Sequence, residues 1–213
     1  MKITPVKTPL VAKKMFPNYV WDIPTTKKEL FLTFDDGPTP EITQWTLDTL
    51  KQYNAKATFF CIGSNIEAHP DIFNAILKDG NSIGNHTHQH IKGWSTKTKD
   101  YLNNVLQAQE VITKQTNSKR AGLFRPPYGQ IKPKQGKELI ALGYKIIMWD
   151  VLSFDWEQTL TEDNCLENVL SKSKPGSIIV FHDSIKASKN MMYALPKVLE
   201  TFSNKGYVFK SLT

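Results

Sequence analysis

Ionisable side chains gather at five places in this 213-residue sequence, and each place follows a short apolar run. The groups are Asp35 and Asp36 in TFDDGP, His86, His88 and His90 in NHTHQH, Arg125 in FRPPYG, Asp150 and Asp155 in WDVLSFDW, and His182 and Asp183 in IVFHDS. Carboxylates and imidazoles are the side chains that most often transfer protons or bind a catalytic metal. The pattern therefore predicts acid–base or metal chemistry.

The adjacent pair Asp35 and Asp36 can serve two purposes. Two neighbouring carboxylates are costly to place together unless a cation or hydrogen bonds compensate their charge. Successive side chains of an extended segment point opposite ways, so one carboxylate can bind a metal while the other faces a different group. The competing interpretation is structural, because Asp-Gly-Pro is also common in turns.

The histidine cluster is a candidate metal site. On a helical turn His86 and His90, four residues apart, would share a face and could bind one metal, whereas His88 would point elsewhere. A carboxylate from another strand end would complete a site of two histidines and one aspartate, with open positions for water. Such a donor set suits zinc, cobalt, nickel or manganese.

Arg125 and His182 each have a chemical and a structural interpretation. Arg125 at a strand end would place a permanent positive charge beside the carboxylates, or it would be a surface arginine on a loop stiffened by two prolines. His182 emerges from a buried strand. Beside a carboxylate it would be a general acid, and without one it would be a satisfied core residue.

Short apolar runs alternate with longer amphipathic segments along the chain. The expected strands are Leu30–Phe34, Ala57–Cys61, Ser82–Gly84, Leu123–Phe124, Lys145–Asp150, Ser177–Phe181 and Tyr207–Lys210. The expected helices are Pro40–Tyr53, Pro70–Lys78, Lys99–Lys114, Lys134–Leu142, Glu162–Ser171 and Met192–Phe202. Gly80, Gly143 and Gly206 are expected just after helix ends, Thr39 and Thr161 at helix N-caps, and Pro40 at a first helical position.

The strict alternation indicates an α/β fold with parallel strands joined by right-handed crossovers. An open doubly wound sheet and a small barrel both fit. An open sheet concentrates its site at one switch point, whereas a barrel builds it from loops at many strand ends. Five loops with ionisable groups favour the barrel. Because a full eightfold barrel needs about 250 residues, we expect a distorted, incomplete (β/α)7 barrel that resembles a TIM barrel.

The ordered motifs TFDDG, HTxxH, RPPYG, SFDW and IVFHD resemble those of the polysaccharide deacetylases of carbohydrate esterase family four, which contain the NodB homology domain. The resemblance covers Lys28 to Phe209. It implies a distorted barrel that removes acetyl groups from N-acetylated, and in some members O-acetylated, sugars with a divalent metal, most often Zn²⁺. Peptidoglycan, chitooligosaccharide, an exopolysaccharide and acetylated xylan all remain open as the substrate.

The resemblance also implies roles for the first three motifs. Asp36, His86 and His90 resemble the metal ligands of the family. Asp35 resembles its general base, and Arg125 resembles the partner that orients that base.

The resemblance also implies roles for Tyr128 of the third motif and for residues of the last two motifs. Tyr128 would offer its backbone N–H to the oxyanion. His182 resembles the general acid with Asp155 behind it, while Trp156 and Val180 resemble the walls of the pocket for the acetyl methyl group.

Two positions depart from the family pattern. Many members carry an aspartate where this chain has Leu152, which we interpret as variation outside the core machinery because Asp155 and Trp156 remain. His88 stands where an aromatic residue is common, and it would be a harmless replacement or a substrate contact.

Two other functions stay open: an amide hydrolase for a small non-sugar substrate, and a carbohydrate-binding remnant without activity.

Composition excludes several classes of protein. A hydrophobic fraction of 40% indicates a folded chain, and no apolar run is long enough to predict a transmembrane segment. The net charge of +7 comes from scattered lysines, which favours a solvated surface; attraction to an anionic polymer is the alternative. No nucleic-acid-binding signature is present, so no nucleic acid partner is expected. Cys61 and Cys165 are too few for a disulfide scaffold.

The N-terminus does not resemble a secretion signal, which predicts a cytoplasmic protein or an unrecognised export route. We expect residues 1–27 to be an extension packed on the barrel and residues 28–213 to be the deacetylase domain. No feature of the sequence predicts an oligomeric state.

Overall fold

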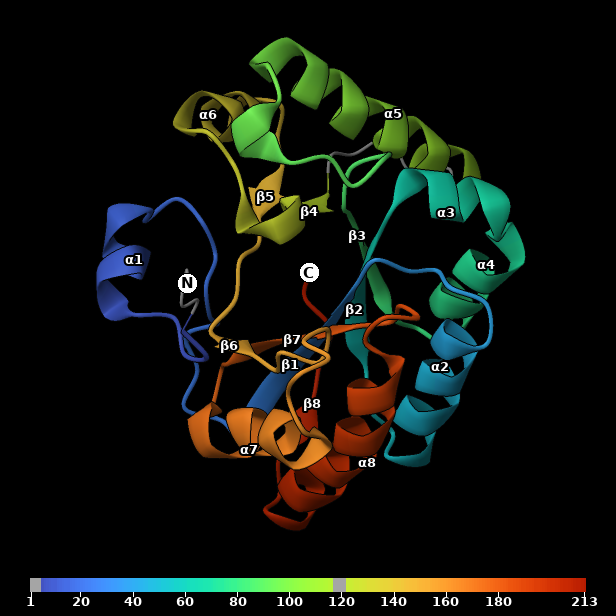
Figure 1. Ribbon diagram of the computed structural model, residues 1–213, viewed down its shortest axis with the longest axis vertical. Coiled ribbons are helices and arrows are strands. Elements are labelled where there is room, and N and C mark those ends of the chain that lie inside the picture. Colours follow the sequence, from blue (N-terminus) through green and yellow to red (C-terminus); the bar gives the residue numbers. More distant parts are fainter. Residues whose placement is uncertain (1–4, 117–121) are drawn as a thin grey trace.

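The computed structural model describes residues 5–116 and 122–213, and a parallel sheet forms its centre (Figure 1). The strands are β1 (Glu29–Asp35), β2 (Ala57–Cys61), β3 (Ser82–Asn85), β4 (Leu123–Phe124), β5 (Lys145–Ile146), β6 (Val151–Leu152), β7 (Ile178–His182) and β8 (Val208–Phe209). Their order is β5-β4-β3-β2-β1-β7-β6, and β8 pairs with β1 beside this path. The central strands are almost entirely buried, as expected for parallel strands that are covered on both faces.

Helices surround the outside of the curled sheet (Figure 1). They are α1 (Leu10–Met15), α2 (Ile42–Gln52), α3 (Gly63–Ala68), α4 (Pro70–Lys78), α5 (Thr98–Thr116), α6 (Pro133–Ala141), α7 (Glu162–Lys172) and α8 (Ser188–Asn204), with short 3-10 turns η1 (Gly93–Ser95) and η2 (Pro127–Gly129). The main hydrophobic core lies between the strands and this outer layer. None of the described helices is long and apolar enough to cross a membrane.

The N-terminal segment lies in the gap between the two ends of the sheet. Strands β5 and β6 are the two ends of the strand order, and among the described residues they do not pair with each other. Val20 instead bridges Ile147, and Lys7 bridges Val151. The sheet is therefore a distorted, incomplete (β/α) barrel, which confirms the predicted fold class. A domain boundary at residue 27 stays a prediction, and residues 1–4 of that extension lie outside the described residues.

One predicted strand is wrong, because Lys145–Asp150 divides into parts that serve opposite ends of the sheet. Just after β5, the N–H of Ile147 still donates to the carbonyl oxygen of Phe124 in β4, at 2.8 Å. The N–H of Asp150 already donates to Ile178 of β7, at 2.9 Å. The chain thus crosses the gap here: only Lys145–Ile146 of the predicted strand lies in β5, and the next strand, β6, begins at Val151, after the predicted run ends.

The ends of the predicted helices were partly correct. Thr161 caps α7, since its hydroxyl accepts a hydrogen bond from the Asn164 N–H at 3.2 Å. Thr39 is not a cap and Pro40 is not helical, because α2 begins only at Ile42. The three predicted helix-end glycines Gly80, Gly143 and Gly206 all have positive φ, as predicted. Helices α1 and α3, six residues each, were not predicted; elements that short carry too little periodicity.

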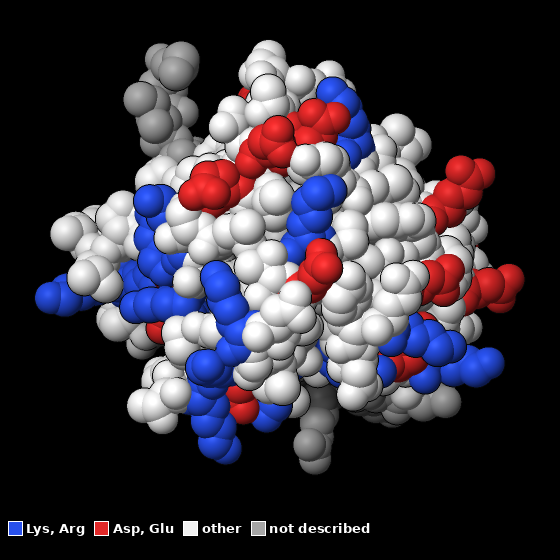
Figure 2. Space-filling model, turned by 90° about the horizontal axis from the view of Figure 1, so that it is seen from below, with Lys and Arg blue, Asp and Glu red and all other residues white. Residues whose placement is uncertain are grey.

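Charge on the surface is mixed. On the face shown in Figure 2, acidic side chains form a band near the upper edge and basic ones gather toward the lower left, with both signs elsewhere. The lysines and arginines behind the net charge of +7 therefore do not cover that face as one continuous basic surface.

Candidate active site

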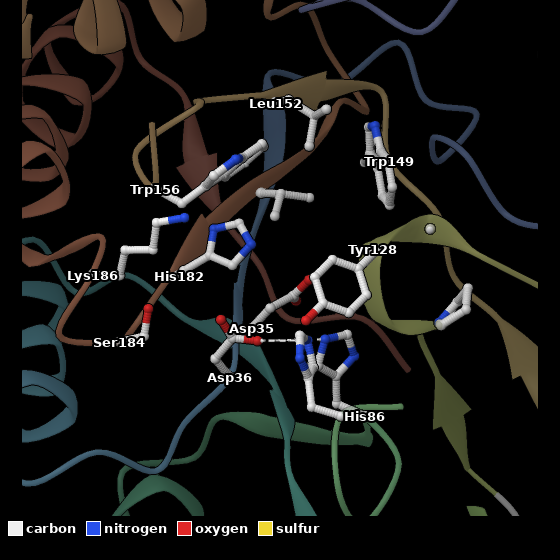
Figure 3. Close-up of a pocket in the computed structure, with 14 residues that line it drawn as sticks. Asp35, Asp36, His86, Tyr128, Trp149, Leu152, Trp156, His182, Ser184 and Lys186 are labelled. Carbon is white, nitrogen blue, oxygen red and sulfur yellow. Dashed lines mark ion pairs between the residues drawn. The ribbon is translucent and has the colours of Figure 1, made fainter. Parts of the chain in front are cut away.

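Loops at the C-terminal ends of the strands surround a cavity of about 530 Å³ (Figure 3). Eight of the ten residues to which the family resemblance assigns a role line it: Asp35, Asp36, His86, His90, Tyr128, Trp156, Val180 and His182. The other two, Arg125 and Asp155, lie buried directly behind that lining. The carboxyl ends of parallel strands share one edge of a sheet, which explains why motifs far apart in the chain meet here.

Asp36, His86 and His90 form a donor set for a metal. One ligand atom from each lies within 4.8 Å of the others. Asp36 Oδ1 is 3.6 Å from His86 Nε2 and 3.1 Å from His90 Nε2, as the dashed lines in Figure 3 indicate. The same oxygen is buried and has no hydrogen-bond partner, a costly state for a carboxylate unless a cation is bound. Two imidazoles and a carboxylate with open positions fit a catalytic divalent metal.

His86 is held in the form that a metal requires. Its Nδ1 lies 2.8 Å from the carbonyl oxygen of Arg125, so Nδ1 must donate and Nε2 keeps its lone pair for the site. Burial lowers the pKa of His86 to about 4, against smaller opposing effects that include the charge of Asp35, and keeps the ring neutral.

The predicted reason for the histidine pairing was wrong, although the pairing itself is present. No helix forms at residues 86–90, which are a loop after β3 with positive φ at Thr87 and His90. Asn104 Oδ1 accepts the backbone N–H groups of His88 and Gln89, at 2.9 and 3.1 Å, and so fixes the loop. The loop rather than helical spacing therefore brings the rings of His86 and His90 to 5.0 Å.

His88 does not line the cavity. Its ring is buried against α3, where Gly63 leaves no room for a side chain because an added Cβ would lie 2.5 Å from His88 Nδ1. Its Nε2 is 3.6 Å from Glu67. Of the two predicted roles, packing fits this position and substrate contact does not.

Asp35 is bound by a fully buried arginine. Arg125 Nη1 donates to Asp35 Oδ1 at 2.7 Å and to the Thr33 hydroxyl at 2.7 Å. Arg125 Nη2 donates to the carbonyl of Met148 at 2.8 Å, and the guanidinium lies 4.2 Å from the ring centre of Phe60. A buried charge needs such a complete set of partners, so the orientation of the Asp35 carboxylate is closely determined.

His182, at the end of the neighbouring strand β7, is paired with Asp155. Its Nδ1 is 2.8 Å from Asp155 Oδ1, and its backbone N–H donates to Asp155 Oδ2 at 2.7 Å. Burial alone would lower the pKa of His182, but the charge and hydrogen bond of Asp155 outweigh it and raise that pKa to about 9. The Trp156 ring packs edge-on against the imidazole, at 4.7 Å. His182 is therefore available as a proton donor facing the cavity.

The turn after β1 is held by residues to which no role was assigned from the sequence. Asp183, fully buried, accepts the Gly37 N–H at 3.0 Å and the Thr43 hydroxyl at 2.5 Å. Asn65 donates to the Asp36 carbonyl at 2.8 Å. Position 37 must be glycine, because an added Cβ would lie 2.0 Å from Asp183 Oδ2. These contacts hold Asp36 at its positive φ of 82°.

Leu152 lies in the cavity wall together with Trp149, Ser184 and Lys186. The departure at Leu152, which we interpret as variation outside the core machinery, thus lies in the cavity wall. The periodicity of the sequence does not show this position. Leu152 lies in β6, at one end of the strand order, and its neighbours in space depend on where the chain crosses the gap between β5 and β6. Asp150, by contrast, takes no part in the cavity: Lys7, Lys13 and Ser177 bind its carboxylate instead.

Comparison with known proteins agrees with this geometry. Residues 22–147 match the family model described as polysaccharide deacetylase. A peptidoglycan-N-acetylglucosamine deacetylase of Bacillus cereus is 36% identical over 91% of this chain and 70% of its own length. The peptidoglycan-N-acetylmuramic acid deacetylase PdaC of Bacillus subtilis is 32% identical over 85% of this chain and 37% of its own.

A solved structure shows the same fold. It is that of Bc1960, a peptidoglycan N-acetylglucosamine deacetylase in complex with 4-naphthalen-1-yl-N-oxidanyl-benzamide. It superimposes with a TM-score of 0.88 at 34% identity and covers 96% of this chain and 95% of that one.

Proposed function

Since this chain belongs to the polysaccharide deacetylase family, we propose that it removes N-acetyl groups from the sugars of peptidoglycan with the help of a divalent metal. One observation carries the proposal: a carboxylate paired with arginine and an imidazole paired with aspartate line the same cavity as one metal donor set. The names of the relatives support the choice of glycan.

Asp36, His86 and His90 would hold the metal, for which Zn²⁺ is the first choice and Co²⁺, Ni²⁺ and Mn²⁺ suit the same donors. A bound metal would polarise the acetyl carbonyl and make water more acidic.

Asp35 accepts the proton of the attacking water. Its carboxylate lines the cavity while Arg125 holds it from behind, so that the free oxygen is aimed at the site. A positioned base of this kind contributes about 10²- to 10⁴-fold to a rate.

His182 donates the proton that the leaving nitrogen needs. The pair with Asp155 fixes Nδ1, so Nε2 is the nitrogen that faces the substrate. Protonation of the amide nitrogen lets the carbon–nitrogen bond break, which yields acetate and a free amino sugar.

The rest of the cavity orients the acetyl group. The backbone N–H of Tyr128 is proposed as the oxyanion donor. Trp156, Val180 and Leu152 supply apolar walls for the methyl group. The Tyr128 ring is 57% exposed at the rim, which leaves the cavity open to a polymer. That openness favours a glycan over a small enclosed substrate, and the complete ligand set argues against an inactive remnant.

Acetate release tests the proposal. Metal-reloaded protein would be incubated with peptidoglycan, chitooligosaccharide, acetylated xylan and a small N-acetylated amide. We expect release from peptidoglycan, its loss in Asp35→Asn, and its loss on chelation. Release from the small amide alone, or release from no glycan, would overturn the proposal.

A further inference from the structure

A lysine reaches into the cavity beside the proton donor. Lys186 lies in the turn between β7 and α8, four residues after His182, and lines the cavity together with Ser184. Figure 3 shows its side chain extending toward Trp156. Within residues 5–116 and 122–213, Lys186 forms no ion pair. Its charge is therefore free for a ligand.

The environment of Lys186 distinguishes it from an ordinary surface lysine. Lys189, three residues further on, is 75% exposed and pairs with Glu162 at 3.4 Å, and it does not line the cavity. The charge of Lys186 acts on the carboxylate of Glu157. One oxygen of that carboxylate, Oε1, accepts hydrogen bonds from the Thr159 hydroxyl at 2.9 Å and from the Thr159 N–H at 3.2 Å. Lys186 is thus an ammonium group lining the cavity that forms no ion pair with a carboxylate among the described residues, although the charge of Glu157 acts on it at longer range.

The opposite rim is also basic. The Lys92 ammonium lies 5.1 Å from the ring centre of Tyr128, and that ring packs on His90 at 4.6 Å. Lysines on two sides of an open cavity create a local positive potential that attracts anionic polymers. The Lys92 ammonium is occupied by the tyrosine face, whereas the Lys186 ammonium has no such partner among the described residues.

We propose that Lys186, assisted by the Ser184 hydroxyl, forms a subsite for a carboxylate that the glycan carries within one sugar of the reacting acetamido group. The proposal rests on the proposed function, since it places the leaving nitrogen against His182. In a muramic acid residue that carries no peptide, the lactyl ether on the carbon next to the acetamido carbon ends in such a carboxylate; where a peptide is attached, the same carboxyl group is an amide. The same group also lies close to the linkage that joins muramic acid to its glucosamine neighbour. The substrate class is therefore a peptide-free, anionic, muramate-containing glycan rather than a neutral one.

The experiment varies the lysine and the carboxylate separately. The substrates are an alternating oligomer of N-acetylglucosamine and N-acetylmuramic acid without peptide, the same oligomer with its lactyl carboxylates reduced to alcohols, and chitooligosaccharide. The proteins are wild type, Lys186→Gln, Lys186→Glu and the control Lys189→Gln, each loaded with the same metal. Acetate release gives kcat and KM, and mass spectrometry identifies which sugar has lost its acetyl group.

We expect wild type to prefer the carboxylate oligomer over its reduced form, with a preference that weakens as salt is added. Lys186→Gln should lower that preference about tenfold, mainly through KM, because one charge-assisted hydrogen bond is lost. Lys186→Glu should lower it further, and Lys189→Gln should keep the wild-type ratio. Each protein is compared across its own substrates, so a loss of folded protein cancels in the ratio.

Three results would count against the subsite. A wild-type enzyme that treats both oligomers alike would overturn it, and so would an unchanged ratio in Lys186→Gln. An equal fall in Lys189→Gln would show a general charge effect and overturn it as well. Wild type that releases acetate from none of the glycans would instead overturn the proposed function, which is a different outcome.

Discussion

Asp35 and Asp36 differ in their neighbours rather than in their own chemistry. The first ends β1 and meets Arg125, whereas the second turns back at positive φ and meets the two histidines. Adjacent residues therefore have separable functions, and substitutions that remove only a charge should distinguish them.

Asp35→Asn should retain the metal and lose acetate release by about 10²-fold or more, because a base is removed without touching a ligand. Asp36→Asn should lose both, since Asp36 Oδ1 is the oxygen that faces His86 and His90. Metal content by elemental analysis, measured with acetate release on the same samples, checks this. Retention of metal in Asp36→Asn with loss in Asp35→Asn would mean that the two roles are reversed.

The pair of His182 and Asp155 predicts a pH dependence. His182 must be protonated to donate, so activity falls as pH rises through its pKa of about 9. Asp155→Asn removes the negative charge that raises this pKa, so the alkaline limb of the kcat/KM profile should move down by about two pH units. Glu157→Gln is the matched control, because its carboxylate is bonded to Thr159. An alkaline limb that stays in place in Asp155→Asn would remove His182 as the acid.

At the scale of elements, the end of β7 supports the turn that follows β1. The two strands are neighbours in register, with Asp35 opposite His182, so Asp183 comes next to Gly37. Burial raises the pKa of Asp183 to about 7, against hydrogen bonds that oppose the shift. The contact of Asp183, at the end of β7, with the turn after β1 therefore depends on pH.

Asp183→Asn should flatten the pH dependence of stability. In the folded protein Asp183 keeps its proton up to about pH 7, while in the unfolded chain it loses it near pH 4. The stability that this group contributes is complete below pH 4 and is lost as pH rises through 7, by up to about 4 kcal/mol. Urea unfolding of metal-free wild type and Asp183→Asn between pH 4 and 8 measures the difference. A difference that grows in the opposite direction would show that Asp183 is ionised in the fold throughout.

At the scale of the whole molecule, the barrel is closed by the N-terminal segment rather than by a further strand. Asp150, at the gap, is fully buried and is bound by Lys7 at 2.5 Å, Lys13 at 2.6 Å and the Ser177 hydroxyl at 2.5 Å. Lys13 also pairs with Asp22. This ion cluster links the segment to the residues that precede β6 and β7.

Asp150→Ala should lower the free energy of unfolding by about 3 kcal/mol, because it leaves two partly buried ammonium groups without their partner. Lys189→Ala breaks an exposed ion pair and should cost less than about 1 kcal/mol. Urea unfolding at pH 7 compares the two. Similar small losses in both variants would mean that the cluster does not hold the N-terminal segment.

Local sequence patterns were enough to predict the order and type of most elements and to identify the motifs. Apolar runs and amphipathic segments are local patterns, so they identified β1, β2, β7 and α4 almost to the residue. Because parallel strands end at one edge, the positions of Asp35, His86 and His182 at strand ends already implied a shared site.

Which side chains face the cavity depends instead on contacts between elements. The Asn104 contacts that fold the loop of His86 and His90, the crossing that places Leu152 in the wall, and the contact of Asp183 with Gly37 all join residues distant in the chain. Such contacts depend on strand order and on the curvature of the sheet. No window of sequence contains them, because they form between elements that only the closed barrel brings together.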